Sequence, residues 1–315
     1  MSPRRPNLFI VGAPKCGTTA WVEYLRTHPD IFFPQTKEDC FFALDLPGFR
    51  TVHTEDEYAK LFEGSEQAKV RGEASVMYLF SETAAQAIRT YDPAAKILIF
   101  LRDQEAFLPS LHNQFVQEFA EEILDFETAW RLSGRRPPES IPPACLEPRT
   151  LDYAAMGRFA AQVGRYLDLF PPRQVRVIRF DEWVADPRNT YLGILKFLGL
   201  DDDGRKDFRP INRGGKYRSR RLVRAMLFPP DWARKIVRLV RRATGFQGYG
   251  LYPWMHKLIR SLTVAGYDRE LEPRLREEIR AYYLDDNRRL DDLLASADVA
   301  ESVNAAELAN RTALA

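Results

Sequence analysis

The chain is poor in cysteine, nearly balanced in charge and free of long hydrophobic runs. Its three cysteines, Cys16, Cys40 and Cys145, stand at unrelated spacings and imply no disulfide framework. The formal net charge of +2 is no signature of nucleic-acid binding, and we expect no nucleic-acid partner. No segment reaches the ~18 apolar residues of a membrane span, and the short apolar run after residues 2–6 cannot serve as a signal peptide. Because two of the cysteines fall in candidate site loops, which favours a reducing compartment, we expect a soluble, cytoplasmic protein.

What the chain does contain is the composition of an ordinary globular core. With 315 residues and 45% hydrophobic content, it is expected to form one large domain over residues 1–296. Residues 134–149 hold five prolines and are expected to form a loop or lid between core elements. Residues 213–262 are expected to be a basic helical region. Residues 297–315 lack a strong apolar face and are expected to fray.

The hydrophobic patterns predict alternating strands and helices. Apolar or alternating runs predict strands at 7–12, 68–73, 96–101 and 174–180. Helical spacing predicts helices at 18–27, 55–63, 81–90, 104–119, 151–169, 188–198 and about 272–295. This order indicates an α/β fold in which right-handed crossovers build a parallel sheet flanked by helices.

The most informative segment is NLFIVGAPKCGTT, residues 7–19. The apolar run 8–11 is typical of a central parallel strand, and residues 12–17 then turn the chain into a helix that begins near Thr18. A helix N-terminus offers unsatisfied N–H groups and the positive end of a dipole, and both suit an anion. This strand, loop and helix therefore predict a P-loop-like phosphate site.

The loop differs from that of the nucleotide triphosphatases, which have G-x-x-x-x-G-K-[ST]. Gly12 and Gly17 keep the spacing, but Thr18 stands in place of the lysine. The lysine is Lys15, inside the loop, from which it can still reach a phosphate. No obvious acidic residue on a following strand is placed to hold Mg²⁺, so the loop predicts an anionic nucleotide handled without a metal. The alternatives are a tight turn with an incidental lysine and a P-loop kinase.

A second candidate anion site follows the apolar run KILIFL at 96–101. Arg102 is expected at the carboxyl end of that buried strand, where open α/β sheets bind ligands. Its guanidinium is a planar donor fork that suits a phosphate, and Ser110 on the following helix adds a hydroxyl donor. The alternative is an Arg102 that pairs with Asp103 or another surface carboxylate.

These segments resemble the PAPS-dependent sulfotransferases, in particular their carbohydrate-type and bacterial branch; PAPS is 3′-phosphoadenosine-5′-phosphosulfate. The strand followed by P-K-x-G-T-T resembles the 5′-phosphosulfate loop of that family. Further segments match in order: His28-Pro29 with KEDCFF at 37–42, GEASVMYL at 72–79, ILIFLRD at 97–103 with Ser110, and NRGGKYRSRR at 212–221. The resemblance covers about residues 7–295 and rests on the ordered set of motifs.

The resemblance implies the sulfotransferase fold and a reaction. A sulfuryl group would pass from PAPS to a hydroxyl or amine of a small-molecule or glycan acceptor, such as a carbohydrate, a lipid or a natural product. The product nucleotide would be the 3′,5′-bisphosphate PAP, and no metal would be needed. Family analogy also places the loop at 134–149 near the acceptor.

The resemblance further implies roles for individual residues. Lys15 would neutralise charge on the leaving 5′-phosphate, and Glu38 would accept the proton of the acceptor. The nucleotide would be bound by the two anion loops and by a basic loop that closes over the 3′-phosphate. These residues are Lys15, Cys16, Gly17, Thr18, Thr19, Arg102, Ser110, Lys216, Tyr217 and Arg218.

Alternatives stay open at several positions. Glu38 could be a solvated partner of Lys37 on a loop. His112 competes as the base, because small-molecule sulfotransferases use a histidine, although their K-x-H context is absent here. The tryptophan that stacks on adenine in that branch is replaced by Ala20. Trp21 is displaced by about 100° around the helix, so the adenine partner stays unassigned.

Residues 213–242 carry a strong excess of positive charge. Eleven Lys or Arg and one acid give them a net charge of about +10, and apolar side chains are interleaved with these charges. The pattern fits contact with a peripheral membrane or an anionic surface, or a solvated helical face beside the nucleotide loop. An inactive nucleotide- or membrane-binding module is the remaining alternative to an enzyme. Intact Lys15, Glu38 and Arg102 argue against it.

Overall fold

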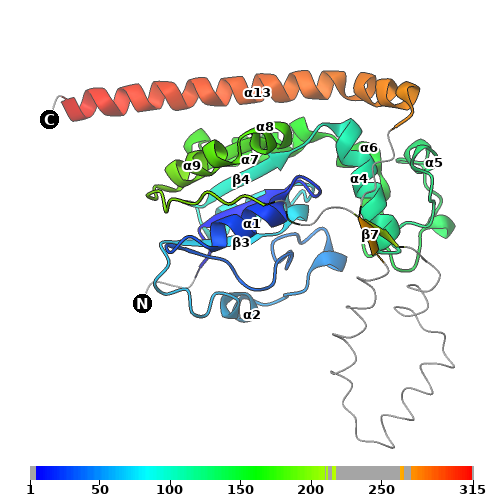
Figure 1. Ribbon diagram of the computed structural model, residues 1–315, viewed down its shortest axis with the longest axis horizontal. Coiled ribbons are helices and arrows are strands. Elements are labelled where there is room, and N and C mark those ends of the chain that lie inside the picture. The colour runs from blue at the N-terminus through cyan, green and yellow to red at the C-terminus, as the bar shows by residue number, and fades with distance from the viewer. Residues whose placement is uncertain (1–4, 210, 212–214, 218–262, 266–270, 314–315) are drawn as a thin grey trace, which may run out of the picture.

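The computed structural model describes residues 5–209, 211, 215–217, 263–265 and 271–313 (Figure 1). Its core is a five-stranded sheet with the order β2-β3-β1-β4-β5, in which all neighbouring strands are parallel. The strands are β1 (Leu8–Gly12), β2 (Ile31–Phe32), β3 (Val70–Ala74), β4 (Lys96–Leu101) and β5 (Val175–Arg179). The predicted parallel sheet is thus confirmed, and β2 is a short edge strand that the hydrophobic pattern does not reveal.

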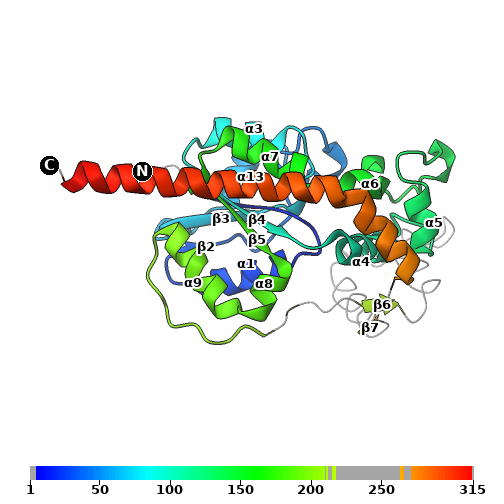
Figure 2. The same ribbon diagram turned by 90° about the horizontal axis from the view of Figure 1, so that it is seen from above.

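Helices cover both faces of the sheet. Figure 2 shows α3 (Ala84–Tyr91) and α7 (Phe159–Leu169) on one side. The other side carries α1 (Thr18–Arg26), α8 (Phe180–Ala185) and α9 (Pro187–Leu198). The chain crosses from β3 to β4 over the central strand β1, so the direction of winding changes at β1. Ligands of open α/β sheets bind at such a switch point, beyond the carboxyl ends of the strands.

The remaining helices lie around this core. They are α2 (Glu55–Lys60), α4 (Gln104–Gln117), α5 (Phe126–Arg131), α6 (Tyr153–Met156) and α13 (Pro273–Ala313). Short α5 and α8 were not predicted, because one or two turns give too little hydrophobic periodicity to detect. A separate two-stranded antiparallel ribbon pairs β6 (Gly215–Tyr217) with β7 (Thr263–Ala265).

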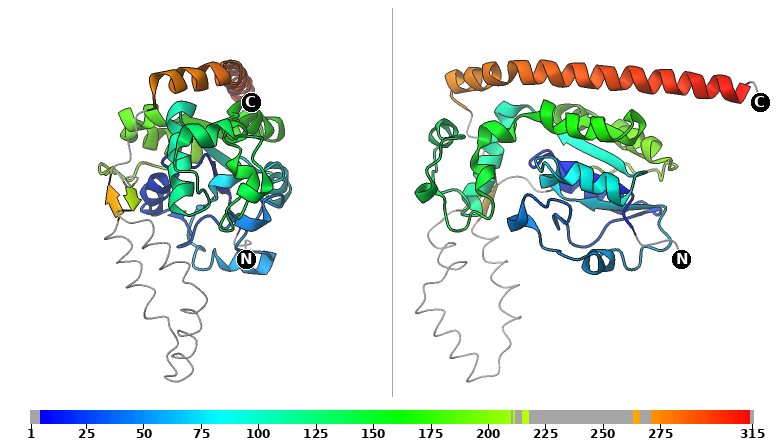
Figure 3. Two further views of the ribbon diagram at one scale, coloured as in Figure 1. Left: turned by 90° about the vertical axis from the view of Figure 1, so that its right-hand side faces the viewer. Right: turned by 180° about the vertical axis from the view of Figure 1, so that it is seen from behind.

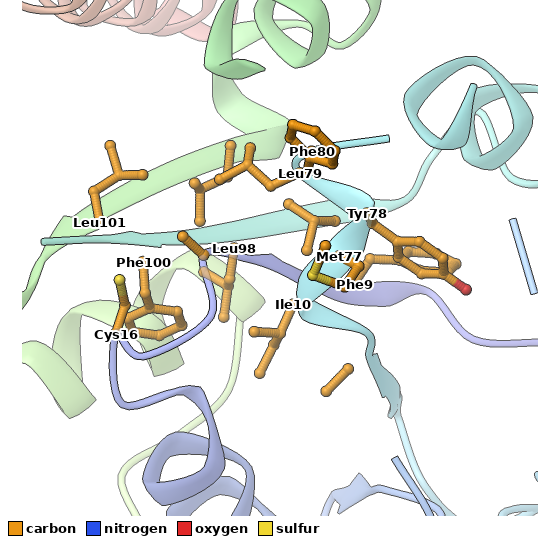
Figure 4. Packing of buried hydrophobic residues seen from close by; sticks show 14 of the residues in the cluster. Phe9, Ile10, Cys16, Met77, Tyr78, Leu79, Phe80, Leu98, Phe100 and Leu101 are labelled. Atoms are coloured by element: carbon orange, nitrogen blue, oxygen red, sulfur yellow. The ribbon is translucent and has the colours of Figure 1, made fainter. Parts of the chain in front are cut away.

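The two central strands β1 and β4 are apolar apart from the half-buried Lys96, as is typical of strands covered on both faces. Every residue of β1 is buried, and so are the five residues that follow Lys96 in β4. Figure 4 shows Phe9, Ile10, Leu98 and Phe100 in one packed cluster with the segment 77–80. The loop after β1 therefore starts from a rigid base.

The helix predicted at 151–169 is divided into α6 and α7. Asp152 caps α6 by accepting a hydrogen bond from the Ala155 amide at 3.1 Å. The Tyr283 hydroxyl donates to the carbonyl oxygens of Tyr153 and Ala154 at 3.1 and 3.0 Å. A long-range side chain thus satisfies backbone groups at the break, and sequence periodicity contains no record of this contact.

The C-terminal helix α13 is longer than predicted. It has 41 residues and continues past 295 to Ala313. Figures 1 and 3 show it lying along one side of the molecule and extending beyond the sheet. Its first half packs against α7 and α4 and buries Leu275, Ile279, Tyr283 and Leu290. The fraying of 297–315 and the single-domain boundary at 296 stay predictions.

Candidate active site

The loop that follows β1 depends on two glycines. Gly12 has φ +150°, and a Cβ there would lie 2.6 Å from the Leu79 Cβ and 2.7 Å from the Val76 carbonyl oxygen. Gly17 has φ +84° and precedes α1, and a Cβ there would lie 2.3 Å from the indole ring of Trp183. The close approach of neighbouring segments therefore requires glycine at both ends of the loop.

The N-terminus of α1 closes the loop that begins at the carboxyl end of β1. The Ala20 and Trp21 amides donate to the Gly17 carbonyl oxygen at 2.9 and 3.2 Å. The amides that precede them, at Gly17, Thr18 and Thr19, are those of the first turn, which have no intrahelical acceptor. Thr18 is buried and Thr19 is half-buried. This turn can bind an anion through its backbone and hydroxyl groups.

Lys15 lies inside the loop, half-buried, with φ +62°. Burial lowers the pKa of its ammonium, the positive charges of Arg102 and Lys37 lower it further, and the negative charge of Glu118 raises it. Among the described residues, neither Lys15 nor Arg102 has a carboxylate oxygen within 4.0 Å. Lys15 and Arg102 thus place two positive charges in one region, which the charge of Glu118 offsets in part, and such a region attracts an anion.

Arg102 directly follows β4, next to β1 in the sheet. Its guanidinium lies over the Phe180 ring, 4.6 Å from the centroid. Among the described residues it does not pair with Asp103, so the surface ion pair considered above is not formed. Ser110 lies half-buried on α4, which starts two residues after Arg102. The two predicted anion loops therefore stand side by side at the carboxyl edge of the sheet.

Glu38 reaches the same edge from the loop between β2 and α2. Its backbone amide donates to the Ala74 carbonyl oxygen at 2.9 Å, which ties the loop to the end of β3. One carboxylate oxygen accepts from the Val76 amide at 2.8 Å, and the other pairs with Lys37 at 2.5 Å. The carboxylate is about one-third exposed. Glu38 is therefore held in place by the fold and is not merely a solvated partner of Lys37.

Comparison with known proteins places this arrangement in a family. Residues 5–211 match the family model described as the sulfotransferase domain. The chain belongs to the sulfotransferase family. A solved sulfotransferase from Alicyclobacillus acidocaldarius superimposes with a TM-score of 0.66 at 30% identity, over 92% of this chain and 96% of that one.

Curated relatives are more distant. Human carbohydrate sulfotransferase 15 is 23% identical over 252 residues, which cover 62% of this chain and 44% of that protein. Human bifunctional heparan sulfate N-deacetylase/N-sulfotransferase 3 is 26% identical over 204 residues, which cover 62% of this chain and 22% of that protein. The matched region is thus less than half of the length of these relatives.

Burial removes the side chain of Cys16, a predicted nucleotide contact, from the candidate site. The Cys16 side chain is fully buried in the core cluster (Figure 4), and burial raises the pKa of its thiol to about 12. Only the backbone of Cys16 is thus left to contact a nucleotide. Trp21 is also fully buried, stacked on Phe100 and edge-on to Trp183. It presents no free face to an adenine.

His112, the competing candidate for the base, is packed among aromatic side chains in the core. It is 1% exposed, and its ring lies edge-on to those of Phe126 and Tyr153. Its Nε2 is 2.8 Å from the Ile123 carbonyl oxygen, and burial lowers the pKa of the imidazole. These contacts give His112 a structural role in joining α4 to the segment before α5.

The proline-rich loop at 134–149 is anchored to the domain through a buried ion pair. Arg136 donates to the two oxygens of Glu121 at 3.1 and 2.5 Å, and Glu121 is fully buried. The Tyr153 hydroxyl donates to the same carboxylate at 3.2 Å. At its other end, Glu147 accepts from the Gly48 amide at 2.5 Å. These contacts fix both ends of the loop.

Of the basic loop, the structure describes Lys216 and Tyr217 as part of β6, which contacts α4, the helix of Ser110. Arg218 and most of 213–242 and of 213–262 lie outside the described residues. The described backbone thus brings the start of this loop to the helix that follows Arg102.

Sequence reasoning missed three residues of the site. Lys37 and Glu118 act electrostatically on Lys15, and Trp183 lies against Gly17. The charge of Lys37 was visible beside Glu38, but Glu118 and Trp183 are far from the loop in sequence and carry no motif of their own. Only the fold reveals them.

Metal-binding clusters and membrane-spanning helices are both absent from the described residues. These residues contain no cluster of three or more His, Cys, Asp or Glu side chains that could hold a metal ion. In the same part of the chain, no helix is long and apolar enough to cross a membrane.

Proposed function

We propose that this protein transfers a sulfuryl group from PAPS to a hydroxyl or amine of an acceptor. The convergence of Lys15, Arg102 and Glu38 at one edge of the sheet supports the proposal most strongly. Two cationic residues there follow the ends of adjacent strands, and the Val76 amide holds the Glu38 carboxylate at the same edge. A bisphosphate nucleotide and a proton-donating acceptor need such an arrangement.

The residues divide the reaction between them. The acceptor oxygen or nitrogen attacks sulfur and forms a new bond, while the bond from sulfur to the 5′-phosphate oxygen breaks. Glu38 takes the acceptor proton, and the electron pair of the broken bond stays on the 5′-phosphate. Lys15, in the loop between β1 and α1, stabilises that negative charge as it develops. Arg102 holds the 3′-phosphate of the nucleotide and takes no part in bond cleavage.

The acceptor class is proposed from the relatives and the site. Curated relatives carry the names of carbohydrate and heparan sulfate sulfotransferases. We propose a hydroxyl-rich acceptor such as a glycan, with lipids and natural products as alternatives. A cytoplasmic, bacterial setting and contact of 213–242 with a membrane or another anionic surface belong to the same proposal and rest on the sequence.

Nucleotide binding is the first test. We expect calorimetry to show that PAP binds equally well with and without a chelator, because cationic side chains and backbone amides supply the phosphate contacts. ATP should bind more weakly than PAP. A strict requirement for Mg²⁺, or a preference for ATP, would favour the P-loop kinase instead.

Glu38→Gln is the test of chemistry. The substitution keeps the size of the side chain but removes the proton acceptor, so turnover of labelled PAPS with an acceptor pool should fall by about 10²–10⁴-fold. PAP affinity should stay nearly constant. His112→Ala is the comparison, because His112 is buried and packs against Phe126 and Tyr153. Loss of turnover in His112→Ala with most activity retained in Glu38→Gln would reject the assigned base.

A further inference from the structure

A buried carboxyl group lies behind the Glu38 loop, and the proposed reaction does not use it. Glu73 is on β3, in register with Phe9 of the central strand, and is only 2% exposed. The Ser75 hydroxyl donates to its Oε1 at 2.5 Å. Its Oε2 has no hydrogen-bond partner among the described residues. An ionised carboxylate with one bare oxygen is costly to bury, whereas a neutral acid is much less so.

The groups around Glu73 also disfavour its negative charge. Burial raises the pKa of Glu73 to about 8, and the negative charges of Asp39 and Glu38 also raise it. The hydrogen bond from Ser75 and the hydroxyl of Tyr78 act in the opposite direction. On the α2 side, the buried Tyr58 lies within electrostatic reach of Glu73, and the Cys40 thiol lies on the loop side. None of these neighbours brings a positive charge.

Glu73 is connected to the Glu38 loop through hydroxyl groups. Ser75, which donates to Glu73, accepts from the Cys40 amide at 3.0 Å. Tyr78 accepts from the Phe42 amide at 3.3 Å. The segment 37–42 is therefore held by backbone bonds to two side chains that stand beside Glu73.

This loop needs such support because its backbone is strained. Glu38 and Cys40 have φ values of +68° and +50°, in the left-handed region that non-glycine residues rarely adopt. Conformations of this kind persist only where the surroundings hold them in place. The hydrogen bonds that Ser75 and Tyr78 accept from the loop amides are part of that restraint. The hydrogen bond that the Val76 amide donates to the Glu38 carboxylate is another part.

We infer that Glu73 is a positioning residue that, as a neutral carboxylic acid, holds Ser75 and thereby the loop that presents Glu38 to the acceptor. The inference rests on the proposed function. When Glu73 loses its proton, a further negative charge joins those of Glu38 and Asp39, and none of the neighbours named above carries a positive charge to balance it. The loop then shifts, and catalysis falls reversibly.

The test compares Glu73→Gln and Glu73→Ala with the wild type. Glutamine keeps the shape and an acceptor oxygen for Ser75 but stays neutral at every pH, whereas alanine removes the support. Glu147→Gln is the matched control, because Glu147 is also a buried glutamate but lies in the proline-rich loop. For each protein we would measure turnover and the thermal midpoint as functions of pH. PAP affinity and the amide exchange of the 37–42 peptide complete the set.

The wild type and Glu147→Gln should lose turnover as pH rises through about 8, and Glu73→Gln should lack this alkaline fall. Glu73→Ala should lose about 10²-fold in turnover at all pH values, as a displaced catalytic group does, with PAP affinity unchanged. An alkaline fall that is the same in Glu73→Gln would overturn the inference, since it would then belong to another group such as Lys15.

Stability and exchange give readouts that need no substrate. An acid whose pKa is raised by folding stabilises the fold fully below its unfolded pKa and loses this contribution as pH rises through its folded pKa. The thermal midpoint of Glu73→Gln relative to wild type should therefore rise between about pH 4.3 and about pH 8 and then level off.

At pH 9 the 37–42 peptide should exchange faster in the wild type than in Glu73→Gln, and at every pH it should exchange fastest in Glu73→Ala. A midpoint difference that is independent of pH, or equal exchange in all variants, would overturn the inference. If these two readouts hold but PAPS is not turned over, the proposed function fails while the positioning of the loop by Glu73 stands.

Discussion

Lys15 and Arg102 follow two adjacent strands, and each is half-buried beside the other's positive charge. Bringing like charges together inside a protein costs free energy unless a ligand offsets it. Their roles in the proposed reaction still differ. The 5′-phosphate near Lys15 gains negative charge as the sulfur–oxygen bond breaks, whereas the 3′-phosphate near Arg102 does not react. Mutations should therefore separate catalysis from binding.

Lys15→Ala should lower turnover by about 10²–10³-fold, the usual effect of removing one group that stabilises a developing anion. Its effect on PAP affinity should be smaller. Arg102→Ala should instead weaken PAP binding by about 10- to 100-fold, because it removes charge-assisted hydrogen bonds to a group that does not change in the reaction. Steady-state kinetics measures the turnover of both variants, and calorimetry measures their affinity for PAP. Equal effects on turnover and affinity in both variants would contradict the division of roles.

At the scale of elements, the unit β1–loop–α1 is shaped by its contacts with segments far along the chain. Trp183 of α8 lies against Gly17, and the segment 76–79 lies against Gly12. The geometry of the loop at 12–17 is thus enforced by segments outside it. Changes at these contacts should alter both folding and nucleotide binding.

Gly17→Ala should destabilise the protein by about 2–4 kcal/mol, because it adds the strain of a positive φ to a collision with the Trp183 ring. Gly199→Ala is the control, since Gly199 has φ +74° but no heavy atom within 4 Å of the added Cβ. It should cost about 1–2 kcal/mol. Urea denaturation measures both, and only Gly17→Ala should also weaken PAP binding. Equal losses of stability would show that Trp183 moves aside freely.

At the scale of the whole molecule, α13 connects the late part of the chain to the sheet domain. Besides its buried apolar residues, the helix forms three ion pairs with the domain. They are Glu278 with Arg131, Arg280 with Glu105, and Asp291 with Arg179, the last at 2.5 Å. These surface pairs contribute little individually. The buried face of the helix should therefore provide most of the docking free energy.

Ile279→Ala should lower the free energy of unfolding by about 2–5 kcal/mol, because the side chain is fully buried between α13 and the domain. Leu284→Ala on the same helix is the matched control, since Leu284 is 48% exposed. It should change stability by no more than about 0.5 kcal/mol. Urea denaturation with both variants tests this, and similar losses would mean that α13 is not docked through the Ile279 face.

The parallel sheet, its main helices and the turn of the chain between β1 and α1 were readable from the sequence alone. Uninterrupted apolar runs such as KILIFL and the glycine-bounded loop at 12–17 carry local signals, because burial and backbone conformation select residue types directly. For the same reason Lys15 and Arg102 could be singled out before the fold was known, whereas Glu38 was identified through the resemblance of the segment 37–42 to a family motif. Signals of this kind need no knowledge of distant neighbours.

The tertiary structure alone decided how those residues act together. The Val76 amide holds Glu38 across 38 positions of sequence, and Trp183 shapes the loop at Gly17. The burial of Cys16, Trp21 and His112 likewise removes side-chain options that their residue types leave open. Such effects arise from contacts and desolvation between segments far apart in the chain, and a linear pattern does not record which segments meet.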